Sequence, residues 1–168
     1  MPINMYKASI PVFERMLNKL SAILEKAAAY SVTKSIDPSV FVNARLAPDM
    51  YPLSRQVQIA TDMVKGFVAR LAGLEVPNYV NDETTFADLQ ARIAKTIAFI
   101  HTVNEGQING TEGHSITLKV RDTELSLLGQ TYLLNFVLPN LYFHITITYA
   151  ILRHNGMELG KMDYLGGY

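Results

Sequence analysis

The sequence contains no cysteine. This absence excludes a disulfide scaffold, a thiol nucleophile and any zinc or iron–sulfur site with cysteine ligands, and it fits a reducing compartment. The sequence also lacks an excess of either charge, because 15 Lys and Arg residues balance 15 Asp and Glu residues. Without a basic surplus, we expect neither nucleic acid nor a membrane surface as a partner.

The familiar catalytic and metal-binding motifs are missing as well. There is no Gly-rich phosphate loop, no Gly-x-Ser-x-Gly elbow, no His-Glu-x-x-His pair and no EF-hand loop. The first residues, Met1–Tyr6, lack the basic region and apolar core of a signal peptide, so the expected location is the cytoplasm. The 168 residues suit a single domain over 1–168 with an ordinary hydrophobic core.

The longest uncharged stretch runs from Leu125 to Leu152 and is long enough to span a bilayer. It is interrupted by Pro139 and contains polar residues such as Asn135 and His144, each of which is costly against lipid. We therefore predict a strand, a short connection and a helix that is buried on most sides.

Hydrophobic periodicity predicts four helices. Apolar residues recur at alternating spacings of three and four, which places them on one face of each of the first three helices. Pro52 suits the first turn of the second helix, and Thr84 or Thr85 suits the cap of the third. The fourth helix is predicted from its start at Pro139 and its stop signal at Asn155-Gly156, although its β-branched interior alternates like a strand. The four predicted helices cover about 5–29, 52–71, 85–104 and 139–155.

Shorter elements are predicted between and after these helices. Asp37-Pro38 favours a short helical turn ending near Arg45, and alternating residues over about 115–128 predict a hairpin with its turn at 121–123. The tail over 157–168 is too glycine-rich for regular structure. The predicted fold is an all-α four-helix bundle with long connections and a small accessory β-hairpin inserted between helices three and four. Long ordered connections often carry function.

Helical geometry places a few polar side chains inside the bundle. His144, with Asn140 one turn before it, faces inward, and Gln56 lies in the middle of the apolar arc of the second helix. In contrast, Gln58, Asp62 and Arg92 are predicted to face outward. A buried polar side chain without a partner costs about 1 to 3 kcal/mol. The inward-facing groups must therefore bond one another or line a cavity, and no carboxylate falls on an inward face to form an acid/base pair.

Three interpretations of His144 remain open at this stage. It is a core histidine bonded to Gln56 or to a carbonyl, a residue that contacts a ligand, or a metal ligand. The Asn140-x-x-x-His144 spacing suits a shared ligand, but asparagine binds transition metals poorly. Arg45 and Asp49 lie four residues apart before Pro52 and either stay solvated or close the end of the bundle above Gln56.

Three segments of the sequence carry a resemblance to a known family. They are RLAPDMYP at 45–52, PNLYFH at 139–144 and ILRHNG at 151–156. They resemble an uncharacterised bacterial and fungal family, a domain of unknown function within the DinB/YfiT-like superfamily of four-helix bundles, and the similarity covers nearly the whole chain. The resemblance implies a bundle with long connections, a homodimer and a divalent metal held by three histidines. It also implies activity as a metal-dependent thiol S-transferase or isomerase.

The sequence departs from the superfamily at the metal site. The superfamily pattern takes one histidine from helix two and a His-x-x-x-His pair from helix four. Here His144 matches one member of that pair, Asn140 stands in place of the other, and Gln56 occupies the inward position of helix two.

We therefore expect no metal cofactor, and a cavity lined by Asp49, Gln56, Asn140 and His144 that binds a small molecule or has only a structural role. The alternative is a divalent-metal-dependent transferase acting on small thiols or electrophiles, with a metal held by His144, Asn140 and Gln56. A third possibility is an interaction module that works through its dimer face.

Overall fold

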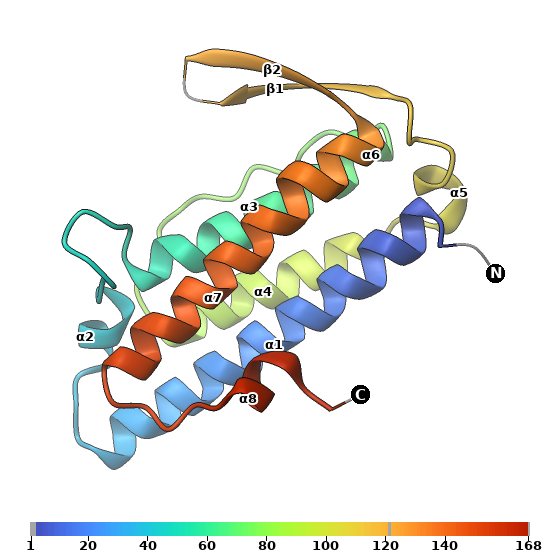
Figure 1. Cartoon of the computed structure of the whole chain (residues 1–168). Helices are drawn as coiled ribbons and strands as arrows, with labels where there is room; N and C mark the ends of the chain where they lie inside the picture. The colour runs from blue at the N-terminus through green and yellow to red at the C-terminus, as the bar shows by residue number, and fades with distance from the viewer. Residues whose placement is uncertain (1–2, 121, 168) are drawn as a thin grey trace.

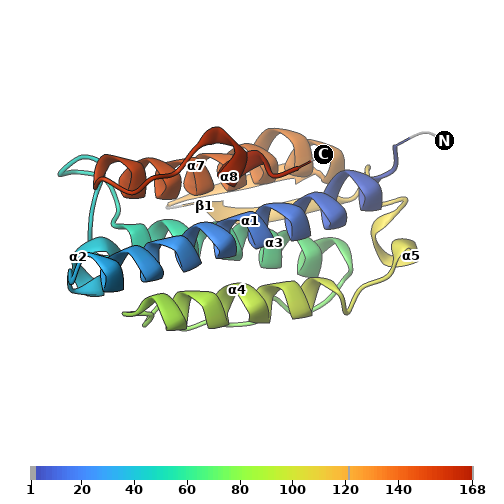
Figure 2. The same ribbon diagram turned by 90° about the horizontal axis from the view of Figure 1, so that it is seen from below.

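The computed structural model describes residues 3–120 and 122–167 and consists mainly of four long helices (Figure 1). These are α1 (Met5–Thr33), α3 (Leu53–Leu71), α4 (Phe86–Ile100) and α7 (Leu138–His154). Helix α3 packs against α4 and α7, and α1 packs against the same two helices. Seen from below, α4 and α7 lie on opposite sides of the pair formed by α1 and α3 (Figure 2). The predicted four-helix bundle is confirmed.

The predicted apolar stripes form one continuous core. Pro52 is the N-cap residue of α3. Thr85 caps α4, which confirms one of the two predicted cap residues, and its side chain and that of Asp88 form a reciprocal capping box. The short predicted turn is α2 (Pro38–Val42), which is capped by the side chain of Asp37. Local sequence signals therefore fix the ends of these helices.

The predicted hairpin is also confirmed. Strands β1 (Ser115–Val120) and β2 (Thr123–Leu128) pair antiparallel, with Leu118 opposite Leu125, after the short helix α5 (Glu105–Ile108). The predicted turn includes Arg121, which lies outside the described residues. The hairpin lies alongside the α3–α7 pair (Figure 1), so one of its faces is available to line a site there.

The start of the fourth helix differs from the prediction. The chain is helical from Gly129 onward, through α6 (Gly129–Thr131) and the π-helix η1 (Tyr132–Val137), and runs directly into α7. Pro139 was expected to begin the helix, because proline breaks the ordinary i→i−4 pattern. The wider π-helical turn before it already departs from that pattern, so the helix accommodates the proline. Gly129 is needed at the start, because a Cβ there would lie 2.1 Å from the carbonyl oxygen of Thr111.

The C-terminal tail also differs from the prediction. It contains the short helix α8 (Lys161–Leu165), which packs on α1. Lys26 forms an ion pair with Asp163, and the guanidinium of Arg15 donates to the carbonyl of Leu165. The tail is thus ordered by tertiary contacts that its own composition does not reveal. Over residues 3–120 and 122–167, no helix is both long and apolar enough to cross a membrane.

Candidate functional site

Gln56 and His144 meet where α3 packs against α7. The Nδ1 atom of His144 lies 2.7 Å from Oε1 of Gln56, and the two residues are 9% and 2% exposed. The prediction that these two side chains approach each other inside the bundle is confirmed.

The hydrogen bonds of Gln56 fix the position of the ring proton on His144. The Nε2 atom of Gln56 donates to the carbonyl oxygen of Tyr51 at 3.0 Å, so its Oε1 atom faces the imidazole. An amide oxygen can only accept, and Nδ1 of His144 therefore carries the proton. The other ring nitrogen, Nε2, is left with its lone pair.

This Nε2 atom has no bonding partner among the described residues. Within the same part of the chain, no buried side-chain nitrogen or oxygen lacks a partner, so Nε2 must touch solvent. Burial, with a contribution from the positive charge of Arg55, lowers the pKa of His144 from 6.5 to about 4. The imidazole is therefore neutral at pH 7 and presents an acceptor nitrogen to the outside.

Two exposed aromatic residues are linked to the Gln56–His144 pair, one through its ring and one through its backbone. The ring of Phe143 packs edge-on against His144 at 5.3 Å, and Tyr51 supplies the carbonyl that holds Gln56. Phe143 and Tyr51 are 53% and 59% exposed, which is high for aromatic rings. The Arg55 guanidinium lies 5.9 Å from the Tyr51 ring. The site thus combines one fixed acceptor, exposed rings and a nearby positive charge.

The other two predicted pocket residues lie elsewhere. Asn140 donates its side-chain amide to the carbonyl of Phe136 at 2.7 Å and lines a different groove. Asp49 is exposed in the turn before Pro52. Arg45 donates to the carbonyl of Met50, and among the described residues it forms no ion pair with Asp49. The structure therefore brings together two of the four predicted residues.

A three-histidine metal centre of the kind implied by the resemblance does not fit these residues. His144 is the single imidazole at the site, and the oxygen of Gln56 already accepts its ring proton. Asn140 uses its amide on the backbone. In the part of the chain that the structure describes, no group of three His, Asp or Glu side chains is placed to hold a metal ion.

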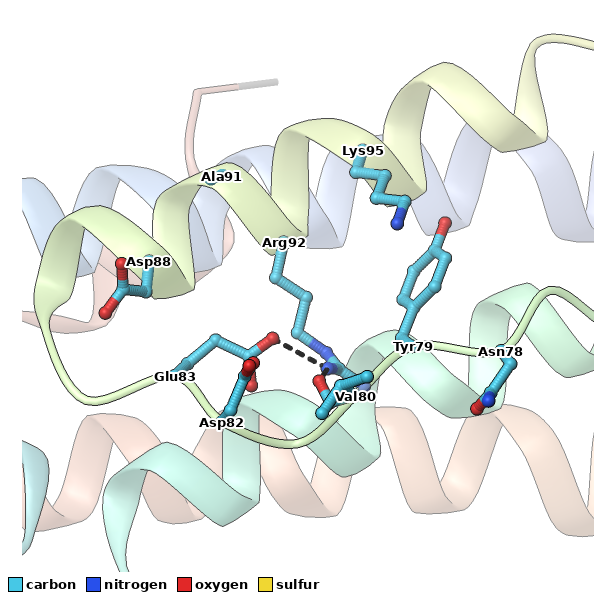
Figure 3. Close-up of a pocket in the computed structure, with 9 residues that line it drawn as sticks. All are labelled: Asn78, Tyr79, Val80, Asp82, Glu83, Asp88, Ala91, Arg92 and Lys95. Atoms are coloured by element: carbon cyan, nitrogen blue, oxygen red, sulfur yellow. Dashed lines mark hydrogen bonds and ion pairs between the residues drawn. The ribbon is translucent and has the colours of Figure 1, made fainter.

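A second polar cluster, which was not predicted from the sequence, lies on the α4 side of α3 (Figure 3). Arg92 was predicted to face outward, but its side chain is only 2% exposed. The prediction was wrong because the connection between α3 and α4, residues 72–85, covers this side of both helices. The same cover explains why Gln58 is buried rather than exposed, with its amide donating to Glu83. A signal was available, since Arg92 lies three residues after Leu89 and therefore at the edge of the apolar stripe of α4.

Every nitrogen of the Arg92 guanidinium is bonded. Nε donates to Thr61, Nη1 to Glu83 and to the carbonyl of Val80, and Nη2 to Asp62, all between 2.8 and 3.0 Å. A hollow of about 440 Å³ lies beside this cluster (Figure 3). With its charges paired internally, the cluster anchors the 72–85 connection to the bundle.

The comparisons with known proteins agree with this architecture. Residues 5–165 match the model of a family described as a domain of unknown function, DUF1993. The chain belongs to this family. A crystal structure of a DinB family member from Shewanella denitrificans is similar to this DUF1993 chain at 40% identity, with a TM-score of 0.87, covering 97% of this chain and 92% of that one. No curated protein matches. The chain is therefore a DinB-like member of the DUF1993 family.

Proposed function

We propose that this protein binds a small molecule through Nε2 of His144, without a metal ion. The supporting observation is the unequal pairing of the two ring nitrogens, since Nδ1 is fixed by Gln56 and Nε2 has no partner among the described residues. A neutral imidazole with one nitrogen fixed offers the other as a hydrogen-bond acceptor of defined direction.

The surroundings define the class of ligand. A hydroxyl or N–H group would donate to Nε2, and an apolar ring next to it would contact the exposed ring of Phe143. The positive charge of Arg55 disfavours a cationic ligand. The expected ligand is a neutral or anionic molecule with a donor group on an aromatic or aliphatic body.

An NMR titration tests this proposal with phenol, which carries a donor, and anisole, which has the same ring without one. In protein labelled with ¹⁵N-histidine, phenol should shift the Nε2 resonance of His144 and anisole should not. Equal responses to both compounds would contradict a hydrogen bond to the imidazole.

A double variant, Gln56→Leu with His144→Leu, separates binding from folding. Removing both side chains of the Gln56–His144 hydrogen bond takes a donor from one further group, the carbonyl of Tyr51, so we expect the free energy of unfolding to fall by only about 1 kcal/mol. Binding of phenol at this site should be lost. A large loss of stability, measured by urea unfolding, would instead assign the pair a structural role.

One observation favours a second candidate, a divalent-metal-dependent transferase acting on small thiols or electrophiles. Metal-binding histidines commonly have the other ring nitrogen fixed by a hydrogen bond, as Gln56 does here. Metal analysis of purified, untagged protein separates the two candidates. Near-stoichiometric zinc, nickel or manganese that is lost in His144→Ala would replace our proposal with this one.

A further inference from the structure

We infer that the groove between α3, η1 and the hairpin is a second binding site, for a small molecule that carries an oxyanion on a planar apolar body. The groove has a volume of about 600 Å³, which is in the range of small-molecule sites. Asn140 lines it, whereas Gln56 and His144 do not. This inference is therefore independent of the function proposed above.

Arg70 supplies the group that would hold the oxyanion. Its Nη1 atom donates to the hydroxyl of Tyr132 at 3.1 Å, and no carboxylate among the described residues pairs with its guanidinium. Its remaining N–H donors are thus available in the groove. A guanidinium can donate two parallel hydrogen bonds to a carboxylate or a phosphate.

Gly66 makes room for this guanidinium. A Cβ at Gly66 would lie only 2.4 Å from Nη1 of Arg70, so the guanidinium occupies the space that a side chain would fill. Glycine is unfavourable in the interior of a helix, and Gly66 lies well inside α3. The position of Arg70 over α3 therefore depends on this glycine.

The π-helix supplies the rigid, planar wall of the groove. The buried ring of Tyr132 lies 5.7 Å from the ring of Phe67 and stacks at 5.8 Å on the ring of Phe136. This packing fixes the hydroxyl that holds Arg70. π-helical turns are frequent at functional sites, and here one places two aromatic residues on the groove.

The charge around the groove is positive. Lys65, Arg70 and Lys119 line it together with one carboxylate, Asp62. That carboxylate already forms ion pairs with Lys65 and Arg92, both at 2.8 Å. Glu124 lies opposite Lys119 in the hairpin, but no carboxylate of the described residues pairs with Arg70 on the α3 wall of the groove. An anion is favoured there over a neutral molecule.

A ¹H–¹⁵N NMR titration of the full chain tests the site with benzoate and with benzamide, its neutral counterpart. Benzoate should shift the amide signals of Gly66 and Arg70, and benzamide should bind more weakly. Phenyl phosphate should bind more tightly than inorganic phosphate, because only the former can contact Phe136. Identical responses to benzoate and benzamide would overturn the proposal. Equal affinities for the two phosphates would contradict the proposed contact between a planar apolar ligand and Phe136.

Two variants separate loss of the site from loss of folding. Arg70→Gln should weaken benzoate binding about tenfold or more, as expected for the loss of hydrogen bonds to a charged group. Gly66→Ala should melt at or above the wild-type temperature, because alanine favours the helix, yet it should lose affinity similarly since it displaces the guanidinium.

Lys34→Gln, which removes an exposed cation at the end of α1, is the control and should bind benzoate like the wild type. The Gln56→Leu, His144→Leu double variant should also retain benzoate binding, which distinguishes this site from the one at His144. Wild-type affinity in both Arg70→Gln and Gly66→Ala would show that the groove does not bind anions in this way.

Discussion

Two polar clusters on opposite sides of α3 differ in how completely their hydrogen-bonding groups are paired. On the α4 side, all three nitrogens of the Arg92 guanidinium have protein partners. On the α7 side, His144 uses one of its two ring nitrogens. A fully paired cluster can stabilise the fold but has nothing left to offer a ligand. An accessible atom without a partner is what a binding site requires.

The clusters also differ in whether their buried basic side chain is charged. Arg92 keeps its positive charge in the interior because Asp62 and Glu83 lie within 2.8 Å of it. Among the residues that the structure describes, no carboxylate pairs with His144, and burial keeps the imidazole neutral instead. The comparison therefore predicts a large effect when the first cluster is broken and a pH-dependent effect at the second.

The largest effect is expected from Arg92→Met. Removing the guanidinium leaves Glu83 without its ion-pair partner and leaves Asp62 paired with Lys65 alone, and breaking a buried ion pair of this kind costs about 3 to 5 kcal/mol. Urea unfolding followed by circular dichroism measures the loss. Lys119→Met, which removes an exposed cation from the hairpin, is the control and should change stability little. A similar loss in both variants would show that the buried ion pairs of Arg92 do not account for its effect on stability.

A smaller effect is expected from acid. The imidazole of His144 has a pKa of about 4 in the folded protein and 6.5 in its ordinary state, so the unfolded chain binds more protons between these values. The stabilisation is complete above pH 6.5, declines as the pH falls and is gone below about pH 4, a total of about 3 kcal/mol.

His144→Gln should remove this part of the pH dependence, as measured by urea unfolding at several pH values. Other acidic groups contribute to unfolding below pH 5, so the difference between wild type and variant is the quantity to compare. His114→Gln, at an exposed loop position, should leave the wild-type slope in place. A slope that His144→Gln does not change would contradict burial of a neutral imidazole.

The smallest effect is expected from Asn140→Ala. This side chain donates to the carbonyl of Phe136, and among the described residues it forms no hydrogen bond with His144, so the loss of stability should be about 1 kcal/mol or less. The NMR titration of His144 should follow the wild-type curve. A changed titration would show that Asn140 and His144 share one site after all, as the sequence suggested.

Much of the candidate site could be predicted from the sequence, because it depends on helical geometry. His144 and Gln56 lie on the apolar faces of two helices, and an amide and an imidazole buried there have to find partners. The same reasoning predicted that Asn140 lines one cavity with Gln56 and His144, whereas it lines a different groove. Its amide turns back to the carbonyl of Phe136 in a π-helix that residue spacing does not reveal.

Periodicity and neighbouring residues are enough to predict the four helices, the Thr85 cap of α4, the end of α7 at Asn155, the hairpin and the contact between Gln56 and His144. Local sequence does not reveal the burial of Arg92, the helical start at Gly129 or the ordered conformation of the C-terminal tail. These three features depend on which distant segment covers a surface. The 72–85 connection, the backbone at Thr111 and helix α1 supply that cover.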